Sequence, residues 1–164
     1  VIKFKEDGEY AFMCSGYEHR PMQEENNVYF AVTVPIVIDE IKYSTVTHYL
    51  YYQKYKHAKK LRKKILEQRD ADGLERLCKY TEPNESISDE KLVIDATREK
   101  FQIPELGKKL IATGDTKLQY NSSDEFWGIG ITGKGRNRLG EILQKVRYEL
   151  NRKKSFSKKE GKQQ

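Results

Sequence analysis

The segment TVTHYLYYQKY, from Thr45 to Tyr55, places several groups that could act on a substrate within one predicted helix. Thr47, Tyr51 and Lys54 stand at positions i, i+4 and i+7, so they share a helix face. His48 lies beside that face. A lysine among tyrosines in a partly desolvated pocket can serve as a nucleophile or as an acid and base. The alternative is a surface lysine whose stem packs over tyrosine rings.

A second candidate is the glycine-rich segment WGIGITGKGRNRLG, from Trp127 to Gly140. Its glycines permit positive φ angles and close backbone approach, and it leads into a predicted helix whose unpaired N–H groups favour anions. Lys134 adds positive charge. The segment could therefore hold a phosphate, although its spacing is neither GxGxxG nor GxxxxGK[ST]. The alternative is a structural loop around a buried Trp127.

A third segment, AFMCSGY from Ala11 to Tyr17, contains small and aromatic residues that could form one edge of a pocket. Ser15 is its polar member. By itself this segment indicates no particular chemistry.

The elements that must position these three segments are predicted from hydrophobic patterns. Short strands are expected at Ile2 to Phe4 and at Lys117 to Tyr120. Val28 to Ile38, VYFAVTVPIVI, is β-branched and aromatic and predicts a buried strand that is interrupted or placed at an edge by Pro35. The polar stretch Gly16 to Asn27 predicts a loop or a hairpin extension.

Helices are predicted where apolar residues recur with helical spacing between capping signals. The expected helices are Thr45 to about Gln68, a short turn at Leu74 to Lys79, one capped by Ser88, one from Pro104 that stops at Gly114, and a last one carrying Leu139 to Leu150.

The length of 164 residues fits one domain. No run of 18 apolar residues and no signal-peptide pattern are present, which predicts a soluble, intracellular and cytoplasmic protein. Cys14 and Cys78 lack the spacing of a zinc site or a disulfide scaffold, so a reducing compartment and no metal are expected.

Most of the net charge of +6 lies at the C-terminal end, where Arg152 to Gln164 holds six basic residues and one acidic residue. This tail is predicted to be a disordered, solubilising end, with a nucleic-acid-binding arm as the alternative. The helix stretch from Lys54 to Lys64 is also strongly basic. It predicts a solvated face or, as the alternative, a surface for RNA or another anion.

Taken together and in this order, the three segments resemble the NADAR family. The family's C-terminal signature reads W-G-x-G-x-x-G-x-G-x-N-x-L-G, and this chain has WGIGITGKGRNRLG, preceded by REKFQIPELGKKLIATGDTKL. Its strand and central helix match PIVIDEIKYSTVTHYLYYQK, from Pro35 to Lys54. FMCSGY is a distant counterpart of the early loop and is followed by an apparent insertion. The resemblance covers Tyr10 to Leu150.

The resemblance implies a mostly helical α+β NADAR single domain with a small β-sheet over residues 1–151, followed by the basic tail 152–164. It implies hydrolysis of the N-glycosidic bond of a phosphoribosyl or ADP-ribosyl compound, without a cofactor. The substrate would be a riboflavin-pathway intermediate or ADP-ribosylated guanine in nucleic acid. Lys54 would attack the anomeric carbon and His48 would assist it. The expected substrate-binding residues are Ser15, Thr47, Tyr51, Trp127, Gly128, Lys134 and Asn137.

Three polar positions of the family's site differ in this chain. Thr47 replaces a glutamate, Ile129 replaces an aspartate, and Ser15 is the nearest polar residue where the early loop has asparagine. An isoleucine or a threonine cannot ionise, so the alternative function is a catalytically reduced binding module for a nucleotide, RNA or a larger assembly. The nearest carboxylates by motif position are Glu18, Asp124 and Glu125.

Overall fold

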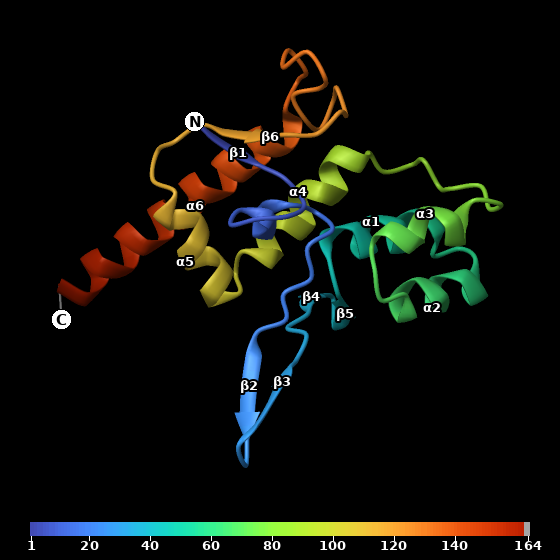
Figure 1. Ribbon diagram of the computed structural model, residues 1–164, viewed down its shortest axis with the longest axis horizontal. Helices are drawn as coiled ribbons and strands as arrows, with labels where there is room; N and C mark the ends of the chain where they lie inside the picture. The colour runs from blue at the N-terminus through green and yellow to red at the C-terminus, as the bar shows by residue number, and fades with distance from the viewer. Residues whose placement is uncertain (163–164) are drawn as a thin grey trace. The chain divides into compact units, whose positions relative to one another are not determined.

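A computed structural model describes residues 1–162, with side chains described as far as Ser157, and these residues divide into two units. The terminal unit combines Val1–Cys14 with the chain from Phe101 onward, and the central unit is Ser15–Lys100. Each unit has its own helices and strands (Figure 1).

The terminal unit is built around two short parallel strands, β1 (Ile2–Phe4) and β6 (Leu118–Tyr120). Both were predicted, and both are confirmed. The Phe4 and Tyr120 rings stack with centroids 5.3 Å apart. Helices α5 (Pro104–Ala112) and α6 (Arg138–Lys162), labelled in Figure 1, complete this unit together with the short helix η1 (Ala11–Met13).

Helix α6 buries the apolar stripe that its sequence predicts. Leu139, Ile142, Leu143 and Val146 are each at most 3% exposed. The helix runs to Lys162, beyond the end expected near Leu150, because Lys, Arg and Glu favour a helix and no proline interrupts it. The segment expected to be a separate disordered tail is therefore helical as far as Lys162, and Gln163 and Gln164 lie outside the described residues.

The central unit begins with an exposed hairpin of β2 (Met22–Glu25) and β3 (Val28–Ala31), in which Met22 pairs with Ala31. Asn26 and Asn27 form its two-residue turn at φ angles of 52° and 65°, where asparagine is well tolerated. The predicted hairpin extension is therefore present. The prediction of a buried strand from Val28 was wrong: Val28 is 61% exposed, because β3 pairs only with β2.

A second hairpin joins β4 (Ile36–Ile38) to β5 (Ile41–Tyr43) through Asp39 and Glu40, which also have positive φ angles. Unlike the first hairpin, it is covered, since β4 contacts a helix and Ile36 and Tyr43 are 3% and 1% exposed. This hairpin leads directly into the helix that carries Lys54.

Four helices form the rest of the central unit: α1 (Val46–Tyr55), α2 (Lys59–Glu67), α3 (Asp72–Cys78) and α4 (Asp89–Lys100). The single helix predicted from Thr45 to Gln68 was wrong, because the chain turns at residues 56–58. This turn lets α2 and α3 fold back on α1, so that Tyr55, Ile65, Leu74 and Cys78 share one core cluster.

The predicted α+β class is confirmed, with predominantly helical structure and three two-stranded ladders among the described residues in place of one small sheet. No helix within residues 1–162 is long and apolar enough to cross a membrane.

Candidate active site

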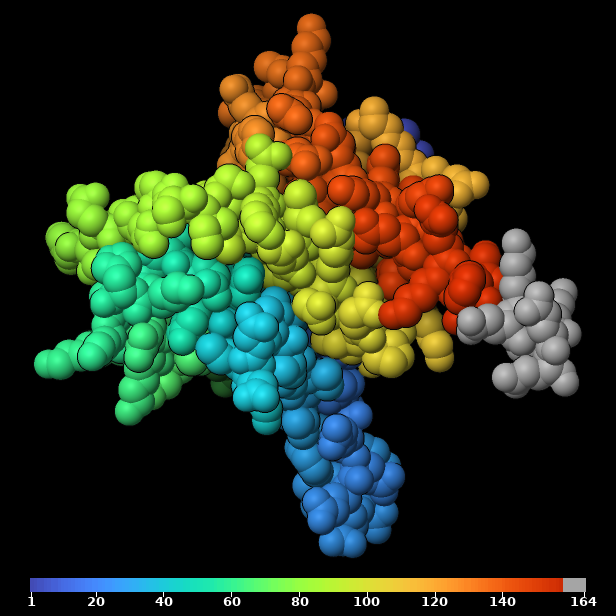
Figure 2. All heavy atoms as spheres, turned by 180° about the vertical axis from the view of Figure 1, so that it is seen from behind, coloured from blue at the N-terminus to red at the C-terminus, as the bar shows by residue number. Residues whose placement is uncertain are grey.

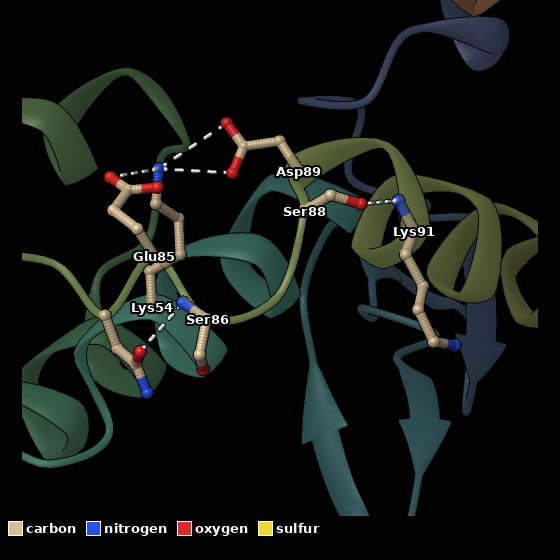
Figure 3. Close-up of polar contacts among 7 residues, drawn as sticks. Lys54, Glu85, Ser86, Ser88, Asp89 and Lys91 are labelled. Carbon is tan, nitrogen blue, oxygen red and sulfur yellow. Dashed lines mark hydrogen bonds and ion pairs between the residues drawn. The ribbon is translucent and has the colours of Figure 1, made fainter.

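Lys54, in the last turn of α1, is held by two carboxylates of the central unit (Figure 3). Its Nζ lies 3.3 Å from Asp89 Oδ1, 3.5 Å from Asp89 Oδ2 and 3.9 Å from Glu85 Oε1. The side chain of Lys54 is only 17% exposed. The ammonium group is therefore fixed in a partly desolvated position with an acceptor for its proton within reach.

Asp89 occupies the first turn of α4, and the start of that helix is fixed by a side-chain cap. Ser88 Oγ accepts a hydrogen bond from the backbone N–H of Lys91 at 3.2 Å, as predicted for the capping serine. Asp89 is thereby carried to Lys54 by a helix that contacts α1. A carboxylate in the first turn also interacts favourably with the helix dipole.

The carboxylates expected from motif position have other partners. Glu18 accepts a hydrogen bond from Thr33 Oγ1 and pairs with Arg20. Asp124 Oδ1 accepts from the backbone N–H groups of Phe126 and Trp127 at 2.8 and 2.7 Å. The sequence did not predict Asp89 as a site residue, because its position at the start of a helix already accounts for an aspartate there. Only the tertiary packing of α4 on α1 brings Asp89 to Lys54.

The early loop joins the beginning of α1 through Ser15 and Thr47. The backbone N–H of Thr47 donates to the carbonyl of Ser15 at 3.1 Å. The neighbouring N–H of His48 donates to Thr45 Oγ1, also at 3.1 Å. The first N–H groups of the helix are thus paired, and Ser15 is fixed beside Thr47.

His48 is fully buried, and both of its ring nitrogens are engaged. Nε2 lies 2.7 Å from the carbonyl oxygen of Gln68 and must donate to it, so Nδ1 accepts from the Thr45 hydroxyl at 2.7 Å. Burial lowers the pKa of His48, which keeps the ring neutral. These two contacts link α1 to the end of α2 through His48, and the catalytic role expected for His48 from sequence stays a prediction.

A cavity of about 610 Å³ adjoins the tyrosine face of α1. Tyr51 and Tyr55 stack with ring centroids 6.0 Å apart and line it, together with Arg76 and Glu82. Its volume falls in the usual range for small-molecule sites. Burial raises the pKa of Tyr51, so its hydroxyl remains protonated at neutral pH and able to donate a hydrogen bond. Tyr51 is therefore placed to contact a ligand.

The glycine-rich loop of the terminal unit uses most of its backbone N–H groups internally. Those of Gly128, Ile129 and Gly130 donate to the carbonyls of Asp124, Tyr120 and Ser122. At the start of α6, the N–H groups of Arg138 and Leu139 donate to Phe126 and Trp127. Few donors remain for a phosphate, so the geometry favours the structural alternative for this backbone. The exposed Lys134 side chain and the Gly133 turn, at φ +79°, remain available.

Asn137 connects the glycine-rich loop to strand β6. At φ +56° and 8% exposure, it accepts from the N–H of Tyr120 at 2.8 Å and donates to the carbonyl of Leu118 at 2.9 Å. Both ends of its amide are thus occupied. The substrate-binding role expected for Asn137 is therefore replaced by a structural one.

Trp127 is half-buried, whereas the structural interpretation had assumed a buried ring. It meets Phe126 edge to face at 4.9 Å and keeps part of its surface free for stacking. Ile129, where the family has aspartate, is 6% exposed. The predicted site residues thus divide between the units: Ser15, Thr47, His48, Tyr51 and Lys54 in the central unit, and Trp127, Gly128, Lys134 and Asn137 in the terminal unit.

Comparison with known proteins identifies relatives over most of the chain. The NADAR domain model matches residues 4–151. The riboflavin biosynthesis protein VVA0006 of Vibrio vulnificus is 35% identical over 135 residues, which cover 77% of this chain and 36% of that protein. N-glycosidase YbiA of Escherichia coli K12 is 34% identical over 122 residues, 71% of this chain and 76% of YbiA. The chain thus spans about a third of the Vibrio protein and three quarters of YbiA.

The fold comparison agrees with the sequence comparison. The NMR structure of E. coli YbiA superimposes with a TM-score of 0.72 at 26% identity, covering 93% of this chain and 86% of YbiA. Sequence and fold therefore place this chain with the same group of proteins.

Proposed function

Because this chain belongs to the NADAR family, we propose that it hydrolyses the N-glycosidic bond of a phosphoribosyl or ADP-ribosyl compound. The observation that carries the proposal is the Lys54 amine, held 3.3 Å from the carboxylate of Asp89. Two kinds of relatives, named N-glycosidase and riboflavin biosynthesis protein, support the same reaction class.

Lys54 would act as the nucleophile after passing one proton to Asp89. Its Nζ attacks the anomeric carbon of the ribose while the bond from that carbon to the base nitrogen breaks. The departing base takes the bonding electron pair and a proton, which Asp89 can return. The sugar carbon gains oxocarbenium character during this step, and the carboxylate of Glu85, which lies 3.9 Å from Lys54 Nζ, can stabilise that positive charge.

Water then completes the reaction. While the ribose is bound to Lys54, its ring can open to an imine. Water adds to that sugar carbon, the electron pair of the carbon–Nζ bond returns to the nitrogen, and the proton lost by the water passes through Asp89 to the lysine amine, so that free ribose phosphate or ADP-ribose leaves. This sequence needs a nucleophile, a proton acceptor and water, so we propose that no cofactor takes part. Within the central unit, Ser15, Thr47 and Tyr51 would contact the sugar.

The alternative proposal is a binding module that keeps the ligand site without hydrolysis. The specific observation in its favour is Thr47, which offers no charge at the position of the family's glutamate. Asp89 answers this objection, because it supplies a carboxylate to Lys54 from a different helix.

The test is release of free base. The protein is incubated with ADP-ribosylated guanosine and, separately, with phosphoribosylaminopyrimidines, and the products are separated by chromatography. Free base from either substrate, absent with Lys54→Ala, is the expected result. Borohydride added during turnover should also leave a ribose-derived mass on Lys54, since it reduces the open-chain imine.

A folded protein that binds ADP-ribose yet releases base from neither substrate class would overturn the enzymatic proposal and favour the binding module. Base release that persists in Lys54→Ala would retain the activity but remove Lys54 as the nucleophile.

A further inference from the structure

Helix α2 carries four lysines on its outer surface: Lys59, Lys60, Lys63 and Lys64, hereafter the α2 lysine face. They form two i, i+4 pairs on one side of the helix. On the opposite side Ile65 is fully buried, and Leu61 packs against the same core cluster. Packing therefore fixes the orientation of α2 and directs all four lysines to solvent, where each is exposed.

Within the described part of the chain, no acidic side chain pairs with the charges of this face. Among the side chains that the structure describes, none of the four lysines forms an ion pair. Glu67 is the single carboxylate on α2. Like charges at i, i+4 destabilise a helix by roughly 0.2–0.5 kcal/mol per pair, so a polyanion that binds here would remove a repulsion present in the free protein.

The α2 lysine face has the composition of a site that binds a partner through electrostatic attraction alone. In Figure 2, long side chains in the teal and green range of the colour bar, which covers α1 to α3, extend away from the surface. None of the exposed large hydrophobic side chains of the described residues belongs to α2. Insertion into a membrane interface, which requires apolar side chains beside the lysines, is therefore not favoured.

A nucleic acid strand matches this surface best. Nine helical residues span about 13 Å, and duplex DNA presents about one negative charge per 1.7 Å of its axis, so several phosphates lie within reach of the four lysines. The face has no aromatic residue to stack on a base. We propose that the α2 lysine face binds the phosphate backbone of a nucleic acid, without reading its sequence.

The test compares two variants with the same change in net charge. In the first, all four α2 lysines are changed to Glu, and a milder version changes them to Gln in case the reversal impairs folding. In the matched control, four exposed lysines scattered over other elements, Lys3, Lys42, Lys108 and Lys117, are changed in the same way. Binding of a fluorescein-labelled DNA duplex is followed by anisotropy at several salt concentrations.

We expect the α2 variants to bind at least about tenfold more weakly near 0.1 M salt, and the control much less so. The slope of log K against log salt should fall by about 0.9 for each phosphate contact removed. Equal losses in the α2 variant and the control would overturn the proposal, because general charge would then explain the binding. No detectable duplex binding by the parent protein would overturn it as well.

Two further measurements separate competing surfaces and partners. Truncation after Leu150 removes the basic end of α6, and duplex binding that disappears with it while the α2 reversal has no effect would overturn the proposal. Tighter binding to vesicles containing phosphatidylserine, or to polyglutamate, than to the duplex would assign the face to another partner. Release of base from a small nucleoside substrate should be unchanged in the α2 variants, so this inference stands or falls separately from the proposed function.

Discussion

The polar groups of the two units differ in how they are bonded. In the central unit, the Lys54 amine lies against its acidic neighbours with its side chain 17% exposed, and Tyr51 of the same helix lines a cavity. In the terminal unit, the hydrogen-bonding groups of the glycine-rich loop and of Asn137 are bonded to each other and to strand β6. The more recognisable motif is therefore the more structural one, and the proposed chemistry lies where the sequence pattern is looser.

The sharpest test of this contrast is the loss of Lys54. Lys54→Ala should lower the rate of base release by about 10³ or more, because it removes the nucleophile. Lys91→Ala is a matched control, since Lys91 also pairs with an aspartate, at 2.8 Å, but on an exposed helix surface. The rate is measured by chromatography, and an equal effect of both variants would contradict the assignment.

Asp89→Asn should act on the same step with a smaller effect, about 10², because removing one acid or base group commonly costs 10²–10⁴ in rate. The loss should appear in kcat and alter the pH profile, with KM changed little. Asp95→Asn, which removes the carboxylate of the control pair, should change neither.

In the terminal unit, the largest effect should be on stability. Asn137→Ala leaves the N–H of Tyr120 and the carbonyl of Leu118 without partners and forces alanine to adopt φ +56°, so the free energy of unfolding should fall by about 2–4 kcal/mol. Urea denaturation measures this change. Asn137→Gly, which tolerates the φ angle, should lose less. If Asn137→Ala instead leaves stability unchanged and raises KM, Asn137 binds the substrate.

A smaller, opposite effect is expected where the family's carboxylates are restored. Thr47→Glu should raise the rate by about tenfold, equivalent to about 1.4 kcal/mol, because it adds a charge on the Lys54 face of α1. Ile129→Asp should give no further gain, since Ile129 is 6% exposed and a buried carboxylate costs at least about 1–3 kcal/mol in stability. An additive gain would contradict this expectation.

The smallest expected effect is the pH dependence contributed by His48. Its pKa is lowered in the folded state, so the unfolded chain binds the proton more readily. Stability should therefore be constant with respect to this group above about pH 6.5 and decline below it, levelling off below the folded pKa. Thermal unfolding between pH 5 and 8, compared with His48→Gln, checks this. If His48→Gln loses as much stability at low pH as the parent, another group causes that loss.

The sequence predicted local features well because each depends on nearby residues. The Ser88 cap, the start of α5 at Pro104 and both strands of the terminal unit follow from capping, proline geometry and β-branched composition.

The features that the sequence did not predict depend on packing between distant segments. The turn at residues 56–58 lets Ile65 reach the core, although the basic stretch reads as one continuous helix. Asp89 meets Lys54 only because α4 packs on α1. The exposure of Val28 could not be foreseen, because β-branched composition is the same whether or not a second layer covers the strand.

The parallel pairing of β1 with β6 also has a consequence for the order in which the protein is made. Ile2 lies opposite Leu118, so β1 has no partner on the ribosome until the whole central unit and α5 have been synthesised. Ser15–Lys100 can form its own core during that interval, while β1 remains unpaired. Closing a loop of that length is slow relative to local helix formation, which makes the joining of the two chain ends the expected late event in folding.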